Sequence, residues 1–164
     1  TNEKELEEKC KMIRQYGWSK DRDSQMPGKC SRLDELQAAV LRVKLNYLNK
    51  HNLKRKEIAK RYDFNLKSSN LLIPKTRENA DHVFHLYVVR SNEREKIMRK
   101  LTILDIHCKI HYPIPIHLQA AYKGRVATSK SLKVTEKICS EILSLPIYTQ
   151  LDLSLVDKIS SFLI

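Results

Sequence analysis

The stretch GKCSRLDELQAAVLRVKLNYL, residues 28–48, decides the fold, because in it a glycine loop passes directly into an amphipathic helix. Ser31 stands where a helix cap is expected, and Asp34 follows three residues later as the acid of a capping box. Apolar residues then recur every three or four positions over 33–47 and again over 58–66. This spacing predicts a helix of about thirty residues whose polar middle leaves the core or bridges two parts of the protein.

The chain after residue 70 alternates between strand and helix patterns, which predicts a small α/β sandwich. A separate short helix is predicted over 3–15. We therefore expect two domains: residues 1–69, a helical segment with a long linker helix, and residues 70–164, a small C-terminal α/β domain. The elements predicted in this second domain are strands over 71–74 and 82–90, a helix over 92–104, a strand from 109 that becomes a proline loop, a helix over 133–143, an extended segment over 143–148 and a helix over 152–163.

Composition restricts the class of protein. The 164 residues are 41% hydrophobic, which is ordinary for a globular protein. No apolar run approaches the ~20 residues of a membrane span, and the first ten residues, TNEKELEEKC, lack the apolar core of a signal peptide. We expect no membrane partner and a cytoplasmic location. The cysteines lack metal-ligand spacing, so we expect free thiols and no metal site. They are Cys10, Cys30, Cys108 and Cys139.

A net charge of +12 raises nucleic acid as a partner. Eight basic residues fall within 42–61, against the single acid Glu57. We favour a solvated helix face over a nucleic-acid surface, because the aromatic residues that would stack on bases are not interleaved with these charges. The alternative that stays open is a basic helical binding or dimerisation module without catalysis.

Five stretches together resemble one family. In this order and spacing they are similar to the C-terminal part of the DegT/DnrJ/EryC1/StrS sugar aminotransferases. The resemblance implies the fold-type I architecture, pyridoxal 5'-phosphate as cofactor, and a homodimer with active sites at the subunit interface. It also implies transfer of an amino group, usually from glutamate, to a nucleotide-linked keto sugar in polysaccharide or amino-sugar biosynthesis. The stretches are QYGWSK (15–20), SRLDELQAAVLRVKL (31–45), HVFHLYVVR (82–90), IHYPIPIHLQAAY (110–122) and EILSLPIY (141–148).

The resemblance also implies which residues bind ligands. The family loop reads G-x-N-S-R, so Cys30 takes the place of the asparagine that binds the cofactor phosphate, and Arg32 matches the arginine. In the loop HYPIPIH, the matching residues His111, Tyr112 and His117 would bind the sugar or its diphosphate. The lysine that forms the Schiff base lies before the position of residue 1 in the family. We therefore assign no catalytic residue and expect the chain alone to be inactive, as a truncated protein or a remnant.

Simpler interpretations of the same residues stay open. A thiol is a poor hydrogen-bond donor beside a carboxamide, which weakens Cys30 as a phosphate ligand. Arg32 fits a solvated first helical turn as well as a binding role. His111 and His117 fit polar residues that are satisfied within a proline-fixed loop. Asp105 stands where the family usually ends a helix with glycine.

Overall fold

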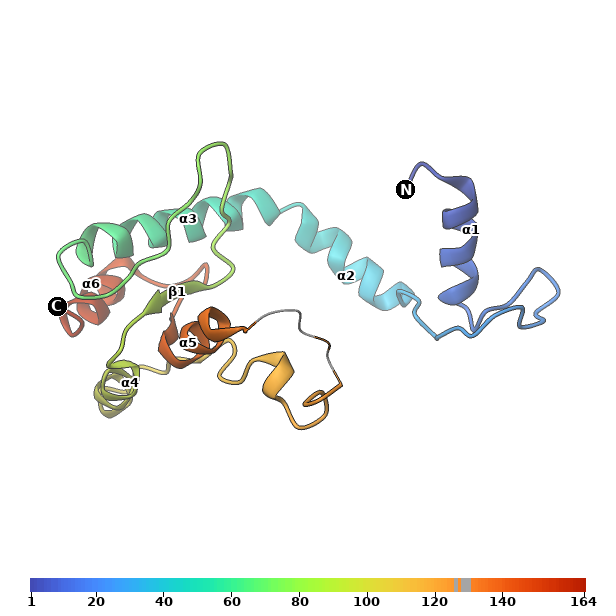
Figure 1. Ribbon diagram of the computed structural model, residues 1–164. Helices are drawn as coiled ribbons and strands as arrows, with labels where there is room; N and C mark the ends of the chain where they lie inside the picture. Colours follow the sequence, from blue (N-terminus) through green and yellow to red (C-terminus); the bar gives the residue numbers. More distant parts are fainter. Residues whose placement is uncertain (126, 128–130) are drawn as a thin grey trace. The chain divides into compact units, whose positions relative to one another are not determined.

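The structure, a computed structural model, describes residues 1–125, 127 and 131–164, and these form two compact units. The first unit is Thr1–Leu48 and the second is Asn49–Ile164. Figure 1 labels most of the elements along the chain. They are α1 (Lys4–Ile13), α2 (Glu35–Leu45), α3 (Leu48–Asn65), β1 (Tyr87–Arg90), α4 (Arg94–Ile103), the 3-10 turn η1 (Ile116–Leu118), α5 (Lys133–Glu141), β2 (Ile142–Leu145) and α6 (Leu153–Ser161).

Helix α1 confirms the helix predicted over 3–15. Its acidic first turn and basic last turn suit the helix dipole. Lys9 Nζ lies 2.8 Å from Glu5 Oε1, one turn away along the exposed surface. None of its residues is buried in this chain, so packing within the first unit contributes little to the stability of α1.

The glycine loop closes onto the end of α1 through its backbone. The Lys29 amide donates to the Ile13 carbonyl at 2.7 Å, and the Ser31 amide donates to the Arg14 carbonyl at 2.9 Å. A Cβ at Gly28 would lie 2.1 Å from the amide nitrogen of Gly17. No other residue fits at position 28 unless this backbone contact opens.

The predicted cap of α2 is wrong. The helix begins at Glu35 with Asp34 in the N-cap position, and Ser31 lies outside it. Ser31 instead continues the extended pairing of the glycine loop: its amide donates to the Arg14 carbonyl, next to the bridge between Gln15 and Cys30. The pairing that closes the glycine loop thus delays the start of the helix.

The long linker helix consists of two helices. Helix α2 ends at Leu45, a turn follows at Asn46 and Tyr47, and α3 begins at Leu48. The first half of α3 is largely exposed, as its polar sequence predicts, and the buried residues of α3 lie in its second half. Those buried residues are Ile58, Ala59 and Tyr62.

The sheet of the second unit is small and antiparallel. Strand β1 pairs with β2 in the register Tyr87 to Leu145 and Arg90 to Ile142. One isolated bridge joins Leu72 to Arg90 on the outer edge of β1, and another joins Lys109 to Ser144 on the outer edge of β2. The described part of the chain therefore holds four extended segments side by side, although only the central two are full strands.

Two strand predictions were too long. Residues 71–74 contribute a single bridge, and the strand predicted over 82–90 begins at Tyr87. Phe84 has φ +48°, a left-handed conformation that cannot continue a strand. Its amide donates to Nδ1 of His82 at 2.8 Å and not to a neighbouring strand.

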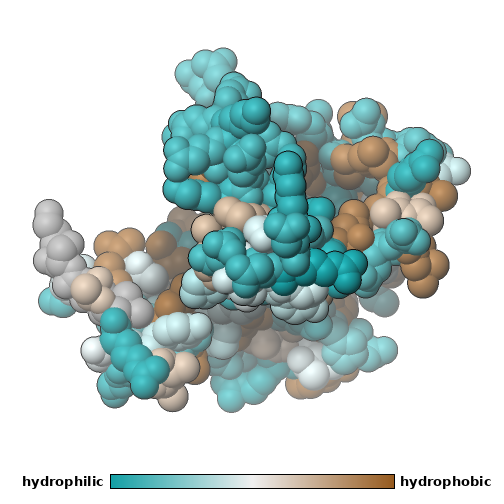
Figure 2. Space-filling model, turned by 90° about the vertical axis from the view of Figure 1, so that its right-hand side faces the viewer, coloured by the Kyte–Doolittle hydropathy of each residue, from teal (hydrophilic) through white to brown (hydrophobic). Residues whose placement is uncertain are grey.

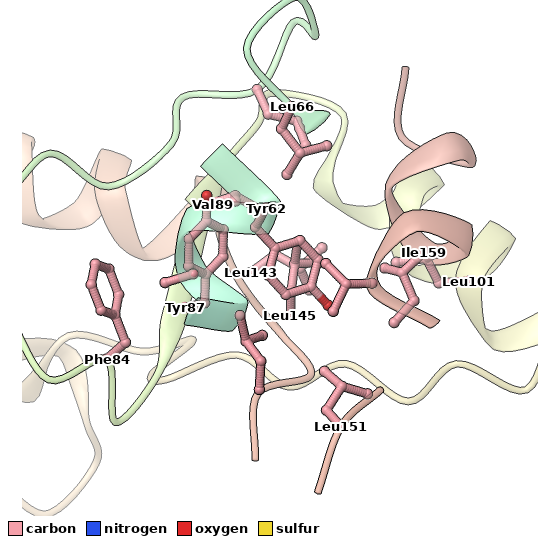
Figure 3. Packing of buried hydrophobic residues seen from close by; sticks show 14 residues of the cluster. Tyr62, Leu66, Phe84, Tyr87, Val89, Leu101, Leu143, Leu145, Leu151 and Ile159 are labelled. Atoms are coloured by element: carbon pink, nitrogen blue, oxygen red, sulfur yellow. The ribbon is translucent and has the colours of Figure 1, made fainter. Parts of the chain in front are cut away.

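Helix α3, the sheet, α4 and α6 share one hydrophobic core, shown in Figure 3. The rings of Tyr62 and Tyr87 stack with centroids 4.8 Å apart. The Tyr62 hydroxyl donates to the Pro146 carbonyl at 3.0 Å, and the Tyr87 hydroxyl donates to Asp63 at 2.7 Å. Each buried aromatic body therefore keeps its polar end satisfied.

Apolar residues of α2 remain exposed within the first unit. The most exposed side chain is Leu36, at 78%. Figure 2 shows hydrophobic surface, in brown, interspersed with the hydrophilic surface of the molecule. Exposed apolar residues on one helix are typical of a surface that another protein segment covers. The others on or next to α2 are Leu33, Val40, Leu41, Val43, Leu45, Tyr47 and Leu48.

No helix in the described ranges is long and apolar enough to span a membrane.

Candidate functional site

In the first unit, Cys30 and Arg32 lie together on the loop before α2. Arg32 Nη2 is 3.7 Å from Cys30 Sγ, and both side chains are exposed. The pKa of the Cys30 thiol is lowered mainly by a hydrogen bond from the Tyr16 hydroxyl and, to a smaller extent, by one from Arg32. The same contact with Cys30 raises the pKa of Tyr16. The thiol therefore has more thiolate character than an ordinary exposed cysteine.

This donor set is only partly suited to a phosphate group. The Arg32 guanidinium offers a planar pair of N–H donors that matches phosphate oxygens. Cys30 offers a weak donor as a thiol and no donor as a thiolate. A phosphate would therefore bind Arg32 in competition with the Cys30 sulfur, so Arg32 fits the group and Cys30 does not.

In the second unit, His111 is fixed against the sheet. Its Nδ1 lies 2.9 Å from Oγ of Ser144, the second-last residue of β2. Ser144 is 5% exposed, and its backbone pairs with Val88 on one side and Lys109 on the other. A half-buried imidazole is thus held by a buried hydroxyl that has no freedom to move away.

His117 is fixed in a comparable way from another element. Its Nε2 lies 3.2 Å from Glu136 Oε1 in the first turn of α5, and its side chain is 16% exposed. Between the two histidines the chain runs through buried Pro115 and the 3-10 turn Ile116–Leu118. The loop is therefore attached at one end to the sheet and at the other end to α5.

Tyr112 is the exposed member of the group. Its residue is 70% exposed, and its ring meets the His111 ring edge to face with centroids 5.5 Å apart. The Tyr112 ring thus packs against a fixed neighbour while most of the residue stays exposed. This arrangement suits a side chain that contacts a ligand in solution.

Of the five predicted site residues, three lie on this one loop of the second unit and two lie on the glycine loop of the first. Sequence reasoning missed Tyr16, Ser144 and Glu136, which contact them. Ser144 carried a signal, since it is the polar residue in the apolar run ILSLPI. Glu136 carried none, because nineteen residues separate it from His117 without a helical or strand spacing.

The basic run of α3 makes contacts within the second unit. Arg55 donates to main-chain carbonyls, including Ile147 O at 3.1 Å, and Arg61 Nε lies 2.6 Å from Asp157 Oδ1. Lys56 Nζ lies 2.7 Å from Asp81 Oδ2. Three of the eight basic residues thus hold the second unit together. All four cysteines are free, and the described residues contain no group of three His, Cys, Asp or Glu that could hold a metal.

The α/β architecture, with its linker helices, is that of the C-terminal part of a fold-type I aminotransferase. The model of the DegT/DnrJ/EryC1/StrS aminotransferase family matches residues 1–163. The chain belongs to this family.

Curated relatives include nucleotide-sugar transaminases. The chain is 43% identical over 147 residues to dTDP-3-amino-3,6-dideoxy-alpha-D-galactopyranose transaminase of Aneurinibacillus thermoaerophilus, an alignment that covers 90% of this chain and 40% of that protein. It is 37% identical over 153 residues to dTDP-3-amino-3,4,6-trideoxy-alpha-D-glucose transaminase of Streptomyces venezuelae, covering 93% of this chain and 40% of the relative. The chain therefore spans well under half the length of these relatives.

Solved structures agree. The crystal structure of Streptomyces venezuelae DesV in complex with a ketimine intermediate superposes with a TM-score of 0.90 at 34% identity, over 99% of this chain and 44% of that one. An aminotransferase of the same family from Brucella abortus gives 0.91 at 33% identity, with the same two coverages.

Proposed function

We propose that this chain is the C-terminal part of a pyridoxal-phosphate-dependent enzyme that transfers an amino group, from glutamate, to the keto group of a nucleotide-linked sugar. The observation that carries the proposal is the family match over residues 1–163. Its support comes from relatives that are named as transaminases of dTDP-linked and UDP-linked sugars. The corresponding pathway would be polysaccharide or amino-sugar biosynthesis in the cytoplasm.

The cofactor, when bound, supplies the electron sink for amino transfer. In this chain, Arg32 would bind the cofactor phosphate and balance part of its charge. Cys30 would contribute little to that contact, because its sulfur already accepts from Arg32. Exchange of Cys30 for asparagine would free the guanidinium and add a carboxamide donor.

The loop with His111, Tyr112 and His117 would bind the nucleotide-linked sugar. Imidazole and phenol groups can donate to phosphate oxygens and exchange hydrogen bonds with sugar hydroxyls. The fixed rings of the two histidines suit this role, because little side-chain entropy is lost when a ligand binds to groups that are already held.

The two domains would be residues 1–69 and residues 70–164, as predicted from the sequence. The exposed apolar face of α2 suits burial against another part of the enzyme or against a second subunit of a homodimer. The lysine that holds the cofactor and the acid at its ring nitrogen would come from outside these 164 residues.

Two assays of the purified chain test this proposal. The chain alone is expected to transfer no amino group from glutamate and to develop no visible absorbance of lysine-bound pyridoxal phosphate. It is nevertheless expected to bind a dTDP-linked or UDP-linked sugar weakly, with NMR shifts at His111 and His117. Amino transfer by the chain alone would contradict the assignment of catalysis elsewhere, and the absence of any shift at millimolar ligand would contradict the substrate loop.

The exposed α2 face also favours a second function, dimerisation without catalysis. Light scattering of the chain across a concentration series tests it. A strict monomer at all concentrations would remove this alternative.

A further inference from the structure

The substrate loop is held by two residues that the family match does not assign. We propose that Ser144 and Glu136 are positioning residues: each occupies one ring nitrogen of a histidine and so directs the other nitrogen toward the nucleotide-linked sugar. The inference rests on the proposed function for the identity of the ligand. The positioning itself rests on the contacts within the second unit.

The contact between Ser144 and His111 is built from the sheet. Side chains alternate between the faces of a strand, so Ser144 points away from the core that holds Leu143 and Leu145. The hydroxyl is buried there, and His111 Nδ1, 2.9 Å away, is its partner across thirty-three residues of sequence. Every buried side-chain nitrogen or oxygen in the described ranges has a hydrogen-bond partner, so removal of either group would leave the other unsatisfied.

The chemistry of each contacting group determines which tautomer of its histidine is compatible with the contact. An ionised carboxylate only accepts, so Glu136 requires the hydrogen of His117 on Nε2 and leaves Nδ1 as an acceptor for a sugar hydroxyl. The Ser144 hydroxyl can donate to Nδ1 of His111 or accept from it, so this contact alone is compatible with either tautomer. The positioning role requires that the hydroxyl donates, which places the hydrogen of that ring on Nε2. Nε2 of His111 is then a donor suited to a phosphate or hydroxyl oxygen.

Imidazole nitrogen NMR of the full 164-residue chain tests the positioning directly. In the unsubstituted chain we expect hydrogens on Nε2 of both histidines. Ser144→Ala is expected to shift the tautomer ratio of His111 by roughly three- to tenfold, the equivalent of one hydrogen bond, and Ser144→Thr to restore it. Glu136→Gln is expected to do the same to His117 alone.

Matched controls separate positioning from general loss of structure. Ser160 is also buried, but its hydroxyl donates to the Val156 carbonyl within α6. Ser160→Ala should leave the His111 ring unchanged, and Glu93→Gln, which removes an exposed carboxylate paired with Lys96, should leave His117 unchanged. A His111 ring that is the same in Ser144→Ala and in the unsubstituted chain would overturn the proposal. A ring that Ser160→Ala alters equally would overturn it as well.

Titration of the same samples with a dTDP-linked sugar tests the purpose of the positioning. The dissociation constant is expected to rise about three- to tenfold in Ser144→Ala and to return in Ser144→Thr. Equal affinity in all three would overturn the positioning role and leave the proposed function standing. If the unsubstituted chain does not bind the sugar while Ser144→Ala still alters the His111 ring, the proposed function fails. The nucleotide-linked sugar is then not the ligand of the nitrogen that Ser144 directs, and this part of the proposal is overturned as well.

Discussion

Arg55 allows a sharp test of what the basic run of α3 does. Its Nη1 lies 3.1 Å from Ile147 O, 3.2 Å from His85 O and 3.4 Å from Phe84 O. One guanidinium nitrogen carries two hydrogens, so two of these three contacts can be well formed at once. They join α3 to the chain before β1 and to the chain after β2, so the side chain connects three segments of the second unit.

The size of the effect follows from these contacts. A hydrogen bond from a charged donor contributes about 1.5–3 kcal/mol, and partial exposure of Arg55 reduces the loss because water can replace the donor. We expect Arg55→Ala to lower the free energy of unfolding by about 2–3 kcal/mol. At roughly 2–4 °C per kcal/mol for a chain of this size, the melting temperature should fall by about 4–12 °C. Arg55→Lys should recover only part of this, since an ammonium lacks the planar fork.

Urea denaturation followed by circular dichroism measures the change. Lys60→Ala is the matched control, because it removes a positive charge from an exposed position on the same helix and should change stability by less than about 0.5 kcal/mol. If the two alanine variants were equally stable, Arg55 would be one more solvated charge and the structural interpretation of this part of the basic run would be refuted.

Four further predictions concern single positions. Asp105 lies just after Leu104, the C-cap of α4, with φ +58°, a conformation that favours glycine. Asp105→Gly should therefore raise the free energy of unfolding by about 0.5–1 kcal/mol in thermal melts, and unchanged or lower stability would contradict this. Gly28→Ala should open the glycine loop, read as loss of amide protection at residues 29–31, and persistence of that protection would argue against the close contact. Hydrogen bonds from Arg61 and Asn65 lower the pKa of Asp157 to about 2 from an ordinary 3.8. The ionised carboxylate therefore stabilises the fold above about pH 4, and this contribution is lost as the pH falls toward 2. Asp157→Asn should flatten the acid side of a plot of stability against pH. The pKa of Cys30 is lowered, whereas burial raises the pKa of Cys108 to about 11. Iodoacetamide at pH 7.5 should therefore alkylate Cys30 well before Cys108. Mass spectrometry gives the order of alkylation, and the reverse order would contradict this prediction.

Residues with a strong local pattern were predictable from the sequence. The spacing of apolar side chains predicted α1, α4 and α6 to within a few residues. The extended segment predicted over 143–148 overlaps β2, but the strand begins at Ile142, inside the helix predicted over 133–143. The interruption at Asn46 and Tyr47 was not predictable, because neither residue is a strong helix breaker. The late start of α2 was missed because it follows from backbone pairing between Arg14 and Ser31, which lie seventeen positions apart.

The candidate site divides in the same way. Cys30, Arg32 and the loop residues could be named only because motifs of the family stand at their positions. Ser144 and Glu136 could not be named, because they reach the histidines through the fold rather than through spacing along the chain. Such contacts depend on how the sheet and α5 come together, and local sequence patterns do not report that.

The most direct test of the central claim is the activity of a graft. Residues 1–164 would replace the matching C-terminal part of the Streptomyces venezuelae transaminase, and the assay would measure amino transfer from glutamate to a dTDP-linked keto sugar. A companion graft with His111→Ala and His117→Ala serves as the matched control. We predict turnover by the graft and its loss in the companion. A folded graft that retains pyridoxal phosphate and yet transfers no amino group, or a companion as active as the graft, would contradict it.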